Sequence, residues 1–238
     1  MNGVDLRPTR PPADPHAAVA PMRLGPATAR VGMVLIHGRG DSAAGILGLL
    51  PALAERGAPE VAVIAPEAAG QTWYPQRFLE PVERNEPWLT SALASVGRAV
   101  AALEADGLAR ERIVVAGFSQ GACLASEFVA RAGGAWGGLV ALSGGLIGDA
   151  VDPARYPKRL NGTPAFFGCS DVDAHIPEAR VHASARQLQA QGAEVVTRIY
   201  PGMPHTVNED EASFLAQHLT QLARASVSPR PDAASGDA

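Results

Sequence analysis

The chain has 238 residues, of which 47% are hydrophobic, and its formal net charge is −4 at pH 7. This length is enough for a sizeable core, and α/β folds of this length commonly form one domain. No cluster of lysine and arginine stands out and Lys158 is the only lysine, so the composition favours a small-molecule partner over nucleic acid or an anionic membrane.

The two ends of the chain differ in composition from its middle. Residues 1–22 are rich in proline and alanine, and they match neither a secretory signal nor a membrane anchor. The tail 227–238 is small and polar. Neither segment can bury enough apolar surface to offset its chain entropy. We therefore predict two disordered ends, one folded domain over 23–226, no membrane span and a cytoplasmic location.

Short apolar runs alternate with longer helix-like segments through the middle of the chain. The predicted strands are 31–37, 61–66, 113–118, 138–143, 164–168 and 195–200. The predicted helices lie near 43–56, 88–106, 120–132, 179–191 and 208–225. Runs that are apolar throughout are typical of strands covered on both faces. We therefore predict an α/β fold with a mostly parallel sheet, helices on both faces, and functional residues at the carboxyl ends of the strands.

A glycine-rich turn follows the first predicted strand, with the sequence His37-Gly38-Arg39-Gly40-Asp41. Such a turn lets a backbone N–H face the tetrahedral intermediate of an acyl transfer. A phosphate-binding loop is a poorer interpretation, because no Gly-x-Gly-x-x-Gly or Walker pattern follows. His37 ends the strand and is predicted to be structural.

Aromatic residues are concentrated in the segment 71–78, which contains Trp73, Tyr74 and Phe78. Near the carboxyl ends of the strands, these three side chains would wall a substrate pocket. A loop packed down by its own aromatic rings is equally consistent with the sequence.

The pentapeptide Gly117-Phe118-Ser119-Gln120-Gly121 lies between a predicted strand and a predicted helix. This Gly-x-Ser-x-Gly pattern is typical of the nucleophile turn of the α/β-hydrolase fold, in which side chains at the glycine positions would collide across the turn. The helix that follows directs its free N–H groups toward the serine oxygen. We therefore predict Ser119 as a nucleophile, with the backbone amides of Arg39 and Gln120 as donors to an oxyanion.

A serine nucleophile needs a base, and in this fold the base follows the acid and the serine in the chain. His182 and His218 lie in helical patterns, where surface positions are the ordinary explanation. His205 instead follows the last predicted strand, in a loop before the last helix. A loop in that place can reach Ser119, so His205 is the predicted base.

The acid comes from the loop after the predicted strand 164–168, which offers both Asp171 and Asp173. Either could orient an imidazole, and the other would then form a turn or a cap. His175 beside them hints at a metal, but no metal-binding spacing accompanies it, and we expect neither a metal nor a cofactor. Cys123 and Cys169 have no metal or redox spacing and are predicted to be reduced and buried.

Together these elements resemble the phospholipase/carboxylesterase family of α/β hydrolases, which includes acyl-protein thioesterases. The resemblance covers about residues 30–222 and rests on the segments 35–41, 117–122, 173–177 and 202–206. The family pattern Asp-x-x-Val/Ile-Pro falls on Asp173. The residue after it is Ala174 where many relatives have proline, and the preceding stretch is longer than in eukaryotic relatives, so Asp171 stays an alternative. The aromatic segment 71–78 resembles a bacterial branch of the family.

The resemblance implies a serine hydrolase that cleaves carboxylic esters through an acyl-enzyme, with thioesters and lysophospholipids as alternatives. No cofactor is implied, and a homodimer is left open. Two other functions compete with this one. A dienelactone-hydrolase-type enzyme shares the fold but often carries cysteine where this chain has Ser119. A hydrolase-fold binding protein without turnover is disfavoured by the intact set of Ser119, Asp173 and His205.

Overall fold

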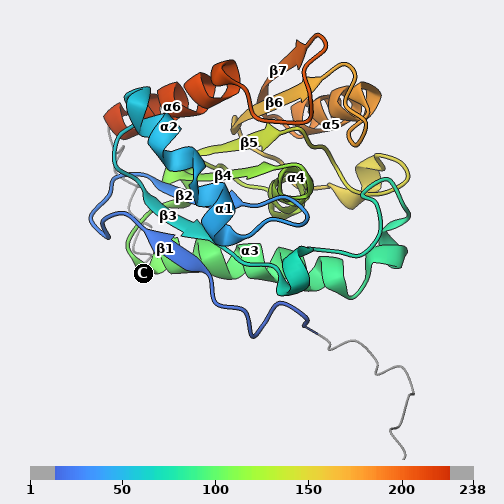
Figure 1. Cartoon of the computed structure of the whole chain (residues 1–238), viewed down its shortest axis with the longest axis horizontal. Coiled ribbons are helices and arrows are strands. Elements are labelled where there is room, and N and C mark those ends of the chain that lie inside the picture. Colours follow the sequence, from blue (N-terminus) through green and yellow to red (C-terminus); the bar gives the residue numbers. More distant parts are fainter. Residues whose placement is uncertain (1–13, 226–238) are drawn as a thin grey trace, which may run out of the picture.

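A seven-stranded sheet forms the centre of the domain in the computed structural model, which describes residues 14–225 (Figure 1). The strand order is β1-β3-β2-β4-β5-β6-β7. The strands are β1 (Met22–Leu24), β2 (Gly32–Ile36), β3 (Ala62–Ala65), β4 (Ile113–Phe118), β5 (Gly138–Leu142), β6 (Pro164–Ser170) and β7 (Glu194–Tyr200). Strand β1 pairs antiparallel with β3, and all other neighbours pair in parallel. The predicted α/β-hydrolase sheet is confirmed, apart from β1, which is too short to give a sequence signal.

Helices cover both faces of the sheet. They are α1 (Ala43–Leu47), α2 (Leu49–Glu55), α3 (Trp88–Ala105), α4 (Gln120–Ala132), α5 (Glu178–Ala190) and α6 (Glu209–Arg224), with short 3-10 turns η1 (Ala69–Gln71), η2 (Val82–Asn85), η3 (Arg110–Arg112) and η4 (Pro153–Arg155). The segment predicted as one helix near 43–56 is two, divided at Gly48. No helix within residues 14–225 is long and apolar enough to cross a membrane.

The continuous apolar runs of β2 to β6 have a simple physical cause, because each of these strands contributes side chains to two cores. Along β2, Val34 and Ile36 belong to the core beneath α3, α4 and α5, while Met33 and Leu35 belong to the core beneath α1, α2 and α6. Figure 1 shows the sheet with its covering helices. Successive side chains of a strand face opposite sides, so a strand covered on both faces is apolar at every position.

Helix α6 begins with a capping box. The Asn208 side chain accepts the amide N–H of Glu211, and the Glu211 carboxylate accepts the amide N–H of Asn208. This reciprocal pair satisfies two backbone donors that have no partner inside the helix. Glu211 is buried, and its second carboxylate oxygen has no hydrogen-bond partner among the described residues.

Residues 14–22 differ from the disordered segment predicted for 1–22. His16 is fully buried, its Nε2–H donates to the Trp73 carbonyl at 3.0 Å, and its Nδ1 accepts the amide of Ala69 at 3.0 Å. Its own amide donates to Ser91 Oγ. The segment thus makes specific polar contacts with distant residues, and the His16 ring also packs against the rings of Trp73 and Trp88. Residues 1–13 and the predicted tail 227–238 lie outside the described residues.

Candidate active site

Ser119 occupies the sharp turn between β4 and α4. Its φ of 54° and ψ of −120° lie outside the regions that a non-glycine residue prefers, so the turn holds strain. A Cβ on Gly117 would lie 2.5 Å from the Gly121 backbone, and one on Gly121 would lie 2.2 Å from the Ile36 carbonyl oxygen. Gly117 is therefore required within the turn, as the sequence predicts, and Gly121 is required by the close approach of the end of β2.

His205 joins Ser119 to Asp173 in one hydrogen-bonded chain. Its Nε2 lies 2.9 Å from Ser119 Oγ, and its Nδ1 lies 2.6 Å from Asp173 Oδ2. The Asp173 side chain is fully buried, while that of His205 is 21% exposed. With Nδ1–H donated to the carboxylate, Nε2 is free to accept the serine proton.

The carboxylate of Asp173 is held in its ionised form. Burial by itself would raise the pKa of Asp173, but the hydrogen bond from His205 and the amides of His175 and Ile176 outweigh it, and the pKa lies below 3.8. Asp173 Oδ1 accepts these two amides at 2.8 and 3.0 Å. A fixed carboxylate of this kind can balance the charge of an imidazolium.

Asp171, the alternative acid, contacts a different group. Its Oδ1 accepts the backbone N–H of Gly202 at 2.8 Å, and its own amide donates to the Tyr200 carbonyl at 3.4 Å. The carboxylate thereby ties the loop that carries Asp173 to the loop that carries His205. Of the two candidates, the structure brings only Asp173 to the imidazole.

The glycine-rich turn after β2 lies directly beside Ser119. A Cβ on Gly38 would lie 3.4 Å from the Cβ of Ser119, which is van der Waals contact. In the described part of the chain, the backbone N–H groups of Arg39 and Gln120 donate to no other protein group. Two unpaired amides on either side of a serine hydroxyl are what an oxyanion requires.

The side chains of His37 and Trp73 hold this turn through hydrogen bonds to its backbone. The buried His37 ring donates from Nδ1 to the Gly38 carbonyl at 2.7 Å and accepts the Ala68 amide at Nε2, as expected for a structural histidine. The Trp73 indole N–H donates to the His37 carbonyl at 2.9 Å. Trp73 is fully buried and does not line the cavity over Ser119, which agrees with the alternative interpretation of a loop packed down by its own aromatic rings. Its buried N–H has its acceptor in the turn.

An open cavity of about 560 Å³ lies over Ser119. Tyr74 and Phe78 line it, as predicted, and Phe118 and Ile176 extend this apolar lining. The charged residues in its lining are Arg39, Asp41 and Arg77. The cavity therefore joins an apolar wall, a nucleophile and a group of charges.

Comparison with known proteins identifies this arrangement. Residues 24–223 match the model of the phospholipase/carboxylesterase family. The chain belongs to this family. It is 28% identical over 214 residues to acyl-protein thioesterase 1 of Saccharomyces cerevisiae, which covers 80% of the chain and 92% of the relative. It is also 26% identical over 161 residues to a probable carboxylesterase of Oryza sativa, covering 68% of the chain and 62% of the relative.

A solved structure agrees with the family assignment. The crystal structure of a phospholipase/carboxylesterase from Dyadobacter fermentans superposes with a TM-score of 0.81 and 38% identity, over 85% of this chain and 97% of that one. The chain is accordingly a hydrolase of the carboxylesterase or thioesterase type.

In this phospholipase/carboxylesterase domain, the side chain of Gln120 has a role that the sequence did not reveal. Its Oε1 accepts the Trp73 amide at 2.9 Å, and its Nε2 donates to the Tyr74 carbonyl at 2.9 Å. The residue after Ser119 thus holds the aromatic loop against the nucleophile turn. No local pattern signals this contact, because its partners lie more than forty residues away.

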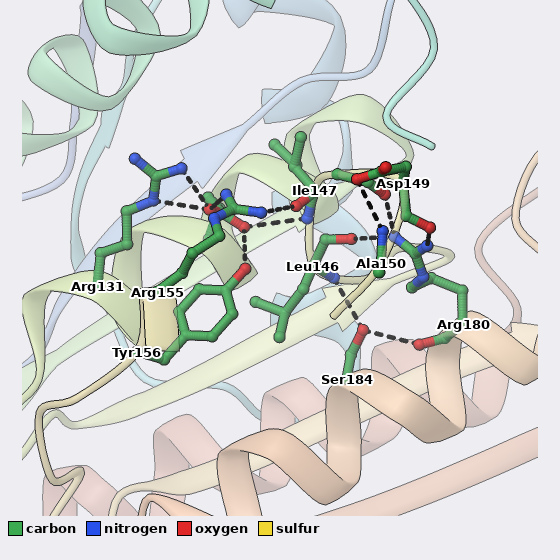
Figure 2. A network of polar contacts seen from close by, with 11 residues as sticks. Arg131, Leu146, Ile147, Asp149, Ala150, Arg155, Tyr156, Arg180 and Ser184 are labelled. Carbon is green, nitrogen blue, oxygen red and sulfur yellow. Dashed lines mark hydrogen bonds and ion pairs between the residues drawn. The ribbon is translucent and has the colours of Figure 1, made fainter. Parts of the chain in front are cut away.

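A buried carboxylate organises the loop that follows β5. Arg131, Arg155 and Tyr156 converge on Glu127, which is fully buried (Figure 2). Glu127 Oε1 accepts from both guanidinium groups, and Oε2 accepts from the Tyr156 hydroxyl and the Ile147 amide, each at 3.0 Å. A buried charge with this many donors fixes its surroundings.

Arg180 holds the same loop from α5 and connects it to the cavity. Its guanidinium donates to the carbonyls of Leu146, Gly148 and Asp149 (Figure 2). The Gly148 amide in turn donates to the Phe78 carbonyl at 2.8 Å. The position of Phe78 in the cavity wall therefore depends on a loop that two charged residues hold.

The other candidates from the sequence have ordinary surroundings. His182 pairs with Glu178 on the surface of α5, as predicted. His218 differs from the predicted surface position, since it lies half-buried against the sheet with Nε2 2.8 Å from the Gly137 carbonyl. His175 is exposed at the cavity, with its ring centroid 4.9 Å from that of His205.

Both cysteines are buried and unpaired, as predicted, and burial raises the pKa of each thiol to about 12. Cys123 lies in the cavity lining, and the thiol of Cys169 lies 3.8 Å from Asp173 Oδ2. Within residues 14–225, no cluster of histidine, cysteine and acidic side chains is arranged to hold a metal.

Proposed function

We propose that this chain is a serine hydrolase that cleaves carboxylic esters, and thioesters of similar size, through an acyl-enzyme on Ser119. The observation that supports this most directly is the hydrogen-bonded chain from Ser119 Oγ through His205 to the buried carboxylate of Asp173. A hydroxyl that donates to a neutral imidazole, itself oriented by a carboxylate, is activated for attack on a carbonyl carbon.

In the proposed reaction, Ser119 attacks the carbonyl while His205 Nε2 takes its proton. His205 then gives the proton to the departing alkoxide or thiolate, and Asp173 stabilises the imidazolium between the two transfers. A water molecule deprotonated by His205 releases the acid product and restores the serine.

The amides of Arg39 and Gln120 are the proposed donors to the oxyanion. Their support is that neither amide donates to a protein group within residues 14–225, that Gln120 directly follows Ser119, and that Arg39 follows Gly38, which lies against Ser119. A donor of this kind lowers the barrier by about 3 kcal/mol, because its dipole is already oriented before charge develops. The N-terminal end of α4 adds its positive dipole end at the same point.

The cavity and the relatives support the proposed substrate class. Tyr74 and Phe78 give the cavity an apolar wall suited to small or medium acyl groups. The relatives named as an acyl-protein thioesterase and a probable carboxylesterase support both thioesters and oxygen esters. Values of kcat/KM across acyl lengths, with matched esters, thioesters and lysophospholipids, would identify the preferred class.

A fluorophosphonate probe tests the nucleophile. We expect covalent labelling of the wild-type chain at Ser119, and neither labelling nor ester hydrolysis in Ser119→Ala. A correctly folded wild-type chain that is never labelled, or a Ser119→Ala variant with full activity, would instead indicate a binding protein on a hydrolase scaffold.

Two asparagine variants test the acid. Asp173→Asn is expected to lower kcat by on the order of 10⁴-fold, because an amide cannot hold the imidazole in the required tautomer. Asp171→Asn retains an oxygen that accepts the Gly202 amide, so it should keep most of the activity. The reverse ranking would show that Asp171 is the acid.

A further inference from the structure

The cavity wall formed by residues 74–78 is held by the guanidinium of Arg39, which pairs with no carboxylate among residues 14–225. The Arg39 guanidinium donates to the carbonyls of Tyr74, Pro75 and Gln76, at 2.8, 3.1 and 2.8 Å. These three acceptors are neutral carbonyl oxygens, so the hydrogen bonds that hold the loop do not neutralise the guanidinium. The loop is thereby fixed, and a positive charge stays at the cavity.

A second side chain fixes the next peptide of the loop. Asn85 is fully buried; its Oδ1 accepts the Gln76 amide at 2.8 Å, and its Nδ2 donates to the Arg77 carbonyl at 3.3 Å. Buried amides that satisfy backbone groups on both sides of a residue hold its Cα in place. The backbone of Arg77 is therefore well positioned at the cavity.

The side chain of Arg77 has no partner of its own. Arg77 is exposed and lines the cavity, and among residues 14–225 no acceptor contacts its guanidinium. By contrast Arg84, on the neighbouring turn η2, pairs with Glu80 at 2.7 Å and is absent from the lining.

The charged side chains of the cavity lining are positive in sum. Arg39 and Arg77 face one acid there, Asp41, and the ionised Asp173 is buried behind His205 and is not part of the lining. The chain as a whole has a net charge of −4. A concave positive region on an acidic protein concentrates anions locally, and a low-dielectric wall strengthens this effect.

We infer that this enzyme prefers esters that carry a second, anionic group, a carboxylate or a phosphate, and that Arg77 binds this group. The inference rests on the proposed esterase function and narrows its substrate class. A guanidinium offers paired donors that match the two oxygens of such an anion. The anion could belong to the acyl part or to the alcohol part of the ester, and the geometry of Arg77 serves either.

Two pairs of substrates separate these cases. For the acyl part, kcat/KM is measured for 4-nitrophenyl hemiglutarate against neutral 4-nitrophenyl butyrate. For the alcohol part, it is measured for 4-butyryloxybenzoate against its neutral methyl ester. Within each pair the reacting carbonyl is similar and only one ester carries a negative charge. The ratio of kcat/KM for the anionic ester to kcat/KM for the neutral ester therefore reports recognition of the anion.

Arg77→Gln is expected to reduce the anionic-to-neutral ratio about tenfold in one pair, the size of one charge-assisted hydrogen bond. Arg77→Lys should restore part of the ratio, and added salt should lower it in the wild type. Arg84→Gln removes an arginine of the same surface outside the cavity lining and should leave the ratio unchanged.

Three results would overturn the inference. If Arg77→Gln changes the anionic and neutral esters equally, or changes neither, Arg77 does not bind the anion. If the wild type hydrolyses neutral esters without preferring either anionic one, the anion preference fails while the esterase proposal stands. If the wild type hydrolyses no ester at all, the esterase proposal fails and this inference fails with it.

Discussion

Replacing Glu127 by glutamine should destabilise the domain strongly, although the two side chains have the same shape. The buried carboxylate accepts hydrogen bonds from Arg131 and Arg155 on Oε1, and from Tyr156 and the amide of Ile147 on Oε2. Glutamine keeps one acceptor oxygen, but its NH₂ group then faces two other donors. The variant therefore loses the negative charge of the carboxylate, and its NH₂ group lies against two other hydrogen-bond donors where an acceptor stood.

The size of the effect follows from the exposure of the partners. Removing one member of a buried ion pair costs about 3–5 kcal/mol when the other charge is trapped. The side chains of Arg131 and Arg155 are 33% and 23% exposed, so both can turn partly toward water. We therefore expect the lower end, about 3 kcal/mol, which is a large share of a typical unfolding free energy of 5–15 kcal/mol.

Urea unfolding followed by circular dichroism measures this loss as a shift in midpoint at constant slope. Arg131→Gln is the matched control, because it leaves Glu127 paired with Arg155 and should cost about 1 kcal/mol or less. A loss in Glu127→Gln that is no larger than the control's would refute the idea that this carboxylate organises the loop after β5.

Three further predictions concern backbone space and pH. Gly121→Ala should abolish ester hydrolysis, because the new Cβ would lie 2.2 Å from a main-chain oxygen. In Gly97→Ala, in α3, the new Cβ meets nothing closer than 3.7 Å, so this variant should stabilise the domain by up to about 1 kcal/mol. Ester assays and urea midpoints of both variants check these expectations. Burial lowers the pKa of His16, so the unfolded chain binds more protons and stability should fall as pH drops below 6.5. In His16→Gln, the urea midpoint should no longer fall between pH 8 and pH 5 as it does in the wild type. The same fall in both proteins would contradict His16 as its cause. Burial raises the pKa of Glu211 from 4.5 to about 7, so the wild-type domain loses stability as the pH rises through that interval. The unfolding free energy of Glu211→Gln, measured by urea midpoints, should therefore rise relative to that of the wild type by up to about 3 kcal/mol between pH 4.5 and 8. A difference between the two proteins that does not change with pH would contradict the raised pKa.

The parts of the molecule that could be predicted from sequence are those with local causes. The Gly-x-Ser-x-Gly pattern of five consecutive residues marks the turn at Ser119. Gly117 is required within that turn, whereas Gly121 is required by the backbone of Ile36 at the end of β2. Apolar strands identified the parallel sheet, because burial on both faces removes polar positions. The place of His205 followed from chain order once the sheet was parallel. The role of each of these residues in catalysis remains our proposal.

The parts that escaped prediction depend on partners distant in sequence. Asp171 and Asp173 lie two residues apart in one loop, and only the folded positions of Gly202 and His205 distinguish them. Trp73 was assigned to the pocket because its ring is aromatic, yet its indole N–H determines where it lies. His16 lies in a segment rich in proline and alanine, and a composition rule cannot detect order that depends on contacts with residues distant in the chain.

The contact of His16 has a practical consequence for anyone who shortens this protein. The likeness to the family begins at residue 24, so trimming the chain to its recognisable portion would remove His16. The Ala69 amide and the Trp73 carbonyl would then lose their partner at the base of the aromatic loop. Each such group left without a partner in the interior costs about 1–3 kcal/mol. The stable domain therefore includes His16, which lies before the start of the family match at residue 24.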